Sequence, residues 1–241
     1  MIASQQAEFI ASHRPFLDWM VEWKANLPTL RWADLTSEVP AERMGVLCVD
    51  MINGFCHEGN LASPRVHALI PAIQQLFQDA YNAGVKQFVL LQDTHRHDAV
   101  EFHDFPLHCV EGTSESETIP ELQELPFADL FQIVPKNSVG AFQETALESW
   151  LNQHADLSLA IMAGTCTDLC VQQLTMHLKF RANARNLPMR VIVPENCVQT
   201  YDLPAQAARE MGALPHDGDF LHLVFLYHLR LNGAEVVRAI E

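Results

Sequence analysis

The stretch LAIMAGTCTDLCVQQLTMHLKF, residues 159–180, joins an apolar run to an amphipathic pattern across a short polar turn. The run 159–164 is continuously apolar, which is typical of a strand buried on both faces of a parallel sheet. Apolar residues then recur at helical spacing and predict a helix: Val171, Leu174 and Leu178. Cys166 and Cys170 stand at the seam between the two elements. From the residues alone they could form a metal pair or a disulfide, pack in the core, or supply a nucleophile.

Four other short apolar runs repeat this strand-like character. They are GVLCVD (45–50), KQFVLLQD (86–93), LFQIVPK (130–136) and MRVIVPE (189–195). Helical patterns alternate with the runs, at 63–84, 140–154, 170–180, 203–214 and 219–233, and AEVVRAI (234–240) is interpreted as a sixth, edge strand. Alternating strands and helices predict right-handed crossovers. The expected fold is therefore α/β, a three-layer α/β/α sandwich around a central, mostly parallel sheet.

The first forty-odd residues follow a different pattern. The segment 7–28 is helical in character and holds Trp19 and Trp23, two of the four tryptophans of the chain. We expect a helical N-terminal extension over residues 1–44, packed on the core or on another subunit. Residues 45–241 are expected to form one domain, because this length is sufficient for a single α/β core.

Charge and composition exclude several classes of protein. The formal net charge is -15, so the field of the whole chain repels phosphate and argues against nucleic acid or an anionic membrane as the partner. No run approaches the roughly 18 apolar residues of a membrane helix, and the N-terminus lacks the basic start of a signal peptide. The six cysteines are scattered, mostly within apolar runs. This pattern predicts reduced thiols in a cytoplasmic protein.

Polar residues gather where the predicted strands end. Asp50, Asp93 and Lys136 close the first three runs, and the fourth leads into Cys170. Ligands of open parallel sheets bind outside the carboxyl ends of the strands. At a helix start, free N–H groups and the helix dipole lower a thiol pKa, so Cys170 is the candidate nucleophile. Asp50 could take its proton, Lys136 could hold the charges, and backbone amides of the turn could receive an oxyanion. Taken alone, each of these residues is more typical of a strand-end cap, a solvated loop charge or, for Cys170, a small buried thiol. Their gathering at one edge favours an active site instead.

The segment QDTHRHDAVEFHDFPLHCVEGT, residues 92–113, is rich in histidine and acidic residues. An Asp-x-His pair at a strand end, followed by glutamate and histidine, suits a divalent metal with mixed nitrogen and oxygen ligands, such as zinc, iron or manganese. A polar loop without a metal is the alternative interpretation. His97 and His103 are assigned to such a loop.

In combination these stretches resemble the isochorismatase-like cysteine hydrolases, and their nicotinamidase branch in particular. The resemblance covers about residues 45–200 and rests on four ordered motifs: VLCVDMINGF, QDTH…EF…FPLHCVEGT, VPKNSVGAF and AGTCTDLCV. It implies the same three-layer fold and a catalytic triad of Asp50, Lys136 and Cys170. It also implies a cis peptide between Thr165 and Cys166, so that the amides of Cys166 and Cys170 would form the oxyanion hole.

The resemblance further implies a metal site and a substrate pocket. The nicotinamidase metal ligands correspond to Asp93, His95 and His108, and Glu101 occupies the place of a glutamate that joins the site in some members. The aromatic residues of the nicotinamide pocket correspond to Phe55 and Phe105. Zinc is the expected metal, and family members are often homo-oligomers. The expected partner is a small amide substrate.

The family opening departs from its common form. Asp-x-Gln-Asn-Asp-Phe is replaced here by DMINGF, which puts Ile52 and Gly54 in place of a glutamine and an acid. The resulting hypothesis is a metal-containing cysteine amidohydrolase that converts nicotinamide and water to nicotinate and ammonia. One alternative is another small amide, carbamoyl or ureido substrate. The other is a non-catalytic member that binds a small molecule or a partner.

Overall fold

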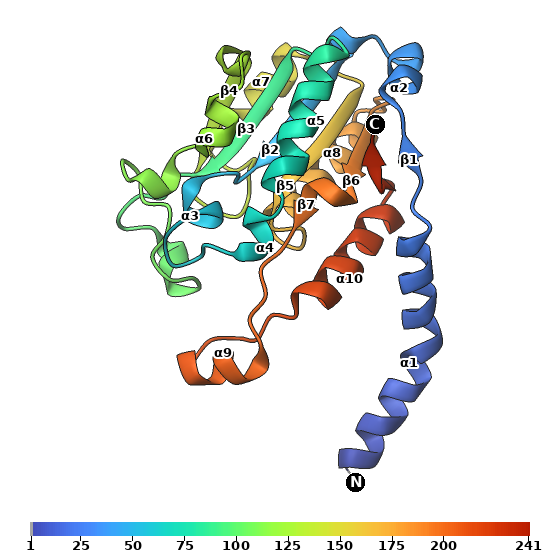
Figure 1. Cartoon of the computed structure of the whole chain (residues 1–241), viewed down its shortest axis with the longest axis vertical. Helices are drawn as coiled ribbons and strands as arrows, with labels where there is room; N and C mark the ends of the chain where they lie inside the picture. The colour runs from blue at the N-terminus through green and yellow to red at the C-terminus, as the bar shows by residue number, and fades with distance from the viewer. Residues whose placement is uncertain (1) are drawn as a thin grey trace.

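A parallel sheet forms the centre of the computed structural model, which describes residues 2–241, with side chains from residue 5 onward. Six strands follow the order β4-β3-β2-β5-β6-β8, every neighbouring pair is parallel, and β7 adds to the end of β5 (Figure 1). The strands are β2 (Met44–Val49), β3 (Gln87–Asp93), β4 (Phe131–Lys136), β5 (Leu159–Thr165), β6 (Arg190–Pro194), β7 (Val198–Gln199) and β8 (Glu235–Val237). The five predicted runs are confirmed as strands, and the sixth lies at the sheet edge as expected.

Helices cover both faces of this sheet and create two cores. They are α3 (Asn53–Cys56), α4 (Pro64–His67), α5 (Ile70–Asn82), α6 (Pro120–Gln123), α7 (Leu147–Gln153), α8 (Cys170–Ala184) and α10 (Gly218–Leu231). A further helix, α9 (Ala205–Met211), projects away from the sheet (Figure 1). Val46 and Cys48 of β2 belong to the core under α5, whereas Leu47 and Val49 belong to the core under α8. This alternation follows from the two-residue period of a strand. The predicted three-layer α/β/α sandwich is confirmed (Figure 1).

The N-terminal segment contributes α1 (Ile2–Ala25), β1 (Thr29–Leu30) and α2 (Trp32–Glu38). The N-terminal part of α1 extends away from the sheet (Figure 1). Its other end meets α10 through an aromatic cluster, in which Phe16, Trp19 and Trp23 surround Tyr227. The later part is integrated in the body, because β1 pairs with the C-terminal β9 (Ala239–Ile240) and Trp32 is buried in the core.

The prediction of one continuous helix over residues 140–154 was wrong, because α7 begins only at Leu147. Thr145 bonds the backbone on both sides of the bend: its hydroxyl donates to the Ala141 carbonyl at 2.6 Å and accepts from Leu147 N–H at 3.3 Å. Such local side-chain bonds compete with helical ones. Phe142 instead stacks on His177 of α8, with ring centroids 3.3 Å apart.

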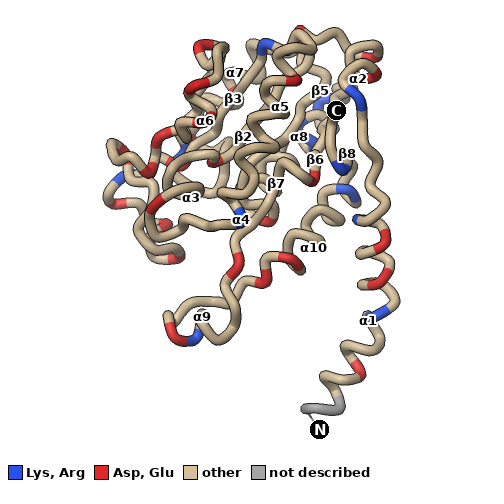
Figure 2. The backbone as a smooth tube through the Cα atoms, viewed as in Figure 1, with Lys and Arg blue, Asp and Glu red and all other residues tan. Residues whose placement is uncertain are grey.

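Acidic side chains are distributed over the loops and helices around the sheet, and basic ones are fewer (Figure 2). The counts are 30 Asp and Glu against 15 Lys and Arg. Within residues 2–241, none of the helices combines the length and the apolar character that crossing a membrane requires.

Candidate active site

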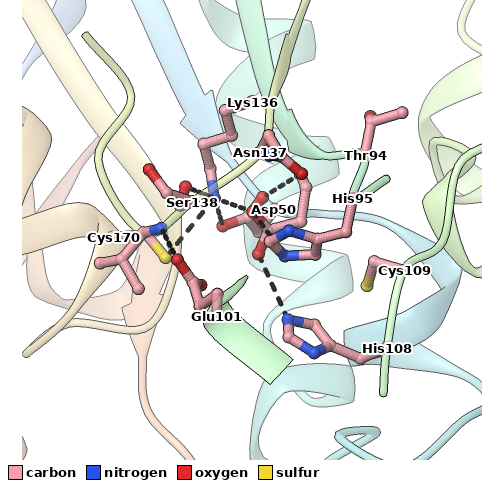
Figure 3. A network of polar contacts seen from close by, with 12 residues as sticks. Asp50, Thr94, His95, Glu101, His108, Cys109, Lys136, Asn137, Ser138 and Cys170 are labelled. Carbon is pink, nitrogen blue, oxygen red and sulfur yellow. Dashed lines mark hydrogen bonds and ion pairs between the residues drawn. The ribbon is translucent and has the colours of Figure 1, made fainter. Parts of the chain in front are cut away.

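The carboxyl ends of β4, β2 and β5, with β3 between β4 and β2, bring the predicted catalytic residues to one edge of the sheet. Asp50 follows β2, Lys136 is the last residue of β4, and Cys170 opens α8 directly after the turn that leaves β5. All three side chains are buried, and they converge on one another (Figure 3). One oxygen each of Asp50 and Asp93 and the Cys170 sulfur lie within 4.8 Å of one another. The structure therefore assembles the group that the strand ends predicted.

Lys136 is the hub of this group. Its Nζ lies 2.5 Å from Asp93 Oδ1, 2.9 Å from Asp50 Oδ2 and 3.7 Å from Cys170 Sγ. Asp50 Oδ1 accepts a hydrogen bond from Asp93 N–H at 2.8 Å. Asp50 Oδ2 pairs with the Lys136 ammonium at 2.9 Å. The buried ammonium balances the two carboxylates, and together they raise its pKa against the opposing effect of burial.

The pKa values of Asp50 and of Cys170 are both raised, which favours the protonated form of each group. Burial raises the pKa of Asp50 to about 6; the Asp93 carboxylate adds to this rise and Lys136 opposes it. Burial also raises the pKa of the Cys170 thiol, and the same two carboxylates add to that rise while Lys136 lowers it. The helix start predicted a lowered pKa for the Cys170 thiol. That prediction was wrong, because the pKa is raised overall. In this site the thiol needs a base beside it, and Asp50 is placed to act as one.

Asp93, His95 and His108 form a second, adjoining group. Their ligand atoms lie within 4.8 Å of one another and all three residues are buried. His95 Nε2 lies 3.4 Å from Asp93 Oδ1, and His95 Nδ1 has no hydrogen-bond partner among the described residues. His108 Nδ1 donates to the Pro106 carbonyl at 2.7 Å, which leaves its Nε2 free, 3.9 Å from Asp93 Oδ2. Buried histidine nitrogens with no partner, beside a carboxylate and with the second ring oriented by a backbone carbonyl, fit a divalent metal site.

Glu101 is not brought into this group. Its Oε2 accepts from the backbone N–H of Val139 at 3.1 Å, so it ties the loop after β4 to the loop after β3. Three phenylalanines surround His108, with ring centroids at 5.8 Å for Phe55, 5.7 Å for Phe102 and 6.3 Å for Phe105. The family resemblance assigned Phe55 and Phe105 to the substrate pocket but did not name Phe102. Phe102 also packs edge-on against His95 at 5.4 Å.

The turn between β5 and α8 has the predicted cis peptide between Thr165 and Cys166. Among the described residues, no acceptor is recorded for the backbone N–H of Cys166 or of Cys170. N–H groups without an acceptor, in the turn that leads into the thiol, are candidates for an oxyanion hole. Gly164 is required before the turn, because its φ is +109° and a Cβ there would lie 1.9 Å from the Val49 carbonyl oxygen.

A sequence model of the isochorismatase domain matches residues 44–213, well over half of the chain. The chain belongs to the isochorismatase family. The predicted resemblance is thereby confirmed, and the protein is an isochorismatase-family hydrolase that resembles nicotinamidases. One relative, nicotinamidase 1 of Arabidopsis thaliana, is 29% identical over 212 residues, which cover 82% of this chain and 86% of the relative.

Solved structures support the isochorismatase-like fold. N-carbamoylsarcosine amidase of Thermoplasma acidophilum aligns with a TM-score of 0.61 at 23% identity, over 81% of this chain and 95% of that one. Pyrazinamidase of Pyrococcus horikoshii, solved in complex with zinc, aligns with a TM-score of 0.62 at 17% identity, over 81% and 99%.

The departures from the common family opening have a packing reason. A Cβ at Gly54 would lie 2.6 Å from Cys109 Sγ and 3.0 Å from the Glu115 carbonyl oxygen. The Cys109 thiol therefore fills the space in which the usual acid would stand, and its own N–H is held by Glu115 Oε2 at 2.9 Å. Ile52 is fully buried in the core under α5. Neither change removes a member of the two buried groups.

Proposed function

We propose that this isochorismatase-family hydrolase is a cysteine amidohydrolase that releases ammonia from nicotinamide or a closely related aromatic carboxamide. The observation that carries the proposal is the contact of Lys136 with Asp50, Asp93 and Cys170 in one buried group. The adjoining Asp93, His95 and His108, ringed by phenylalanines, support an aromatic substrate that carries a nitrogen lone pair. The Arabidopsis nicotinamidase supports the same reaction.

In the proposed reaction the Cys170 thiol passes its proton to Asp50 as the sulfur attacks the amide carbon. The oxyanion that forms faces the free N–H groups of Cys166 and Cys170. Collapse of this intermediate breaks the C–N bond, and the proton on Asp50 leaves with the departing ammonia. A water molecule then gives a proton to Asp50 and attacks the thioester. The acid is released and the proton returns from Asp50 to the Cys170 sulfur.

Asp93, His95 and His108 are proposed to hold a divalent metal, with zinc, as in the Pyrococcus pyrazinamidase, ahead of iron or manganese. The bound ion would supply a Lewis acid that anchors the pyridine nitrogen of the substrate, directly or through water. Phe55 and Phe105 are proposed to line the ring pocket, and Phe102 joins them. Glu101 positions the loop in this proposal and becomes a ligand only through movement of its side chain.

The direct test is ammonia release from nicotinamide by purified protein, with and without added zinc, iron or manganese. We expect turnover that depends on the metal and yields nicotinate in equal amount to ammonia. No ammonia at any metal loading would exclude the nicotinamidase proposal. A parallel set of carbamoyl and ureido compounds tests the second candidate, which the fold similarity to N-carbamoylsarcosine amidase and the changed residues Ile52 and Gly54 favour.

Metal binding can be checked without any substrate. The variant His108→Ala removes one of three proposed ligands and is expected to lower bound zinc at least about tenfold after dialysis, measured by elemental analysis. His103→Ala is the matched control, because His103 lies in the same loop but is exposed, and its ring bonds the Val100 carbonyl at 3.0 Å. Equal zinc content in the two variants would contradict the assigned site.

Homo-oligomerisation, a cytoplasmic location and the division into an N-terminal extension (1–44) and a hydrolase domain (45–241) stay predictions of the sequence.

A further inference from the structure

Two buried histidines from the C-terminal part of the chain meet the turn that carries the nucleophile. We call residues 165–170 the nucleophile turn. His216 precedes α10 and His222 lies on it, 48 and 55 residues after the turn residues that they contact. Their exposed fractions are 8% and 3%. The reaction proposed above uses neither of them, and the sequence reasoning did not single them out.

His216 holds the side chain of Asp168. Its Nε2 lies 2.8 Å from Asp168 Oδ2, and its Nδ1 lies 2.9 Å from the Tyr201 carbonyl oxygen. The imidazole also stacks on the Tyr201 ring, with centroids 3.8 Å apart. Burial tends to raise the pKa of Asp168, but hydrogen bonds, that from His216 foremost, lower it overall. The carboxylate is therefore ionised, and its orientation is set by this imidazole.

His222 holds the side chain of Thr167, the residue before Asp168. Its Nδ1 lies 2.9 Å from the hydroxyl of Thr167, a side chain with no exposure. Its Nε2 lies 3.4 Å from Glu195 Oε1, and the same oxygen pairs with Lys24 of α1 at 2.6 Å. The hydrogen bond from His222, and after it that from Lys24, lower the pKa of Glu195 to about 2, against its burial. The contact chain thus runs from the N-terminal helix to the nucleophile turn.

We propose that His216 and His222 are positioning residues for the Cys170 chemistry. By fixing Asp168 and Thr167, they hold the short segment whose backbone leads into the nucleophile. This inference rests on the proposed role of Cys170 as nucleophile. Two buried polar side chains at successive turn positions, each bonded to a separate imidazole, restrict the turn more than apolar packing does, because hydrogen bonds are directional.

The test replaces each histidine by asparagine or glutamine, whose side-chain amides lie at different distances from the backbone. The amide of asparagine takes the place of histidine Nδ1, and that of glutamine takes the place of Nε2. His216→Gln therefore keeps the bond to Asp168, and His216→Asn loses it. For His222 the pattern reverses, because Thr167 is bonded through Nδ1: His222→Asn keeps the bond and His222→Gln loses it.

Three quantities are measured for each variant: the rate at which iodoacetamide alkylates Cys170, followed by mass spectrometry; kcat and KM for the best amide; and Tm. His216→Asn and His222→Gln are expected to lower the alkylation rate and kcat about tenfold, with KM unchanged. Their partners, His216→Gln and His222→Asn, are expected to stay within about threefold of the parent. Within each pair the Tm values are expected to agree, since each member loses the same ring.

Equal alkylation rates within each pair, or rates that follow Tm, would overturn the proposal and leave a purely structural role. If a histidine variant does not fold, Thr167→Val and Thr167→Ser test the same contact from the nucleophile turn. Thr167→Val is expected to lower the alkylation rate about tenfold, and Thr167→Ser, which keeps the hydroxyl, is expected to retain it. Equal rates for these two would also overturn it. Alkylation requires no substrate, so a parent protein that hydrolyses no amide would refute the proposed function while the positioning test still gives its answer.

Discussion

Replacing Cys170 by alanine is expected to abolish amide hydrolysis, with kcat reduced by about 10⁴-fold or more. The thiol is the only protein group in the proposed reaction that forms a covalent bond to the substrate, so no neighbour can replace it. Tm is expected to change by no more than about 3 °C, because the lost sulfur atom is small. The measurement is steady-state ammonia release, with circular dichroism for Tm.

Cys166→Ala is the matched control, because Cys166 is four residues away in the same turn and is also buried. Its side chain accepts a hydrogen bond from the Thr165 hydroxyl at 3.1 Å, whereas its proposed role belongs to the backbone N–H. We expect Cys166→Ala to keep most of the activity. Comparable activity of Cys170→Ala and the parent would refute nucleophilic catalysis and favour the non-catalytic binding alternative.

Asp50→Asn is expected to lower kcat about 10³-fold, because an amide cannot take the thiol proton. The parent enzyme should show a matching pH dependence. Asp50 must be ionised to act as a base, and burial raises its pKa to about 6. Activity is therefore present above this pH and lost as the pH falls through about 6. In Asp50→Asn the residual activity should lack this acid limb.

The pH profile of kcat/KM between pH 4.5 and 8 tests this expectation. Asp98→Asn serves as the control, because Asp98 is exposed and pairs only with Arg96. It should reproduce the parent profile. An unchanged acid limb in Asp50→Asn would assign the titration to another group and remove Asp50 from its role as base.

The fold was predictable because its signals are local. Five apolar runs and the helical patterns between them led to the parallel sheet, and strand ends led to Asp50, Asp93, Lys136 and Cys170. The helix pattern at 140–154 was wrong because Thr145 bonds the local backbone and Phe142 packs on another helix. Hydrophobic periodicity records burial but does not say which element buries a residue.

The site was predictable only in part. The Asp93, His95 and His108 group came from motif spacing, yet Glu101 proved to bond Val139 rather than to join the group. Phe102 was missed, although its place three residues before Phe105 could have indicated a second aromatic side chain on the same face of a helical turn.

The sequence by itself determined the α/β class, the strand ends and the placement of the cysteine at a helix start, because each depends on neighbours a few residues apart. Only the tertiary structure decided the direction of the Cys170 pKa shift, since burial and two carboxylates from other strands outweigh the helix start. It also decided which residues hold the nucleophile turn. His216 and His222 reach Asp168 and Thr167 from 48 and 55 residues away, and burial and contacts over such separations arise only when the chain is folded.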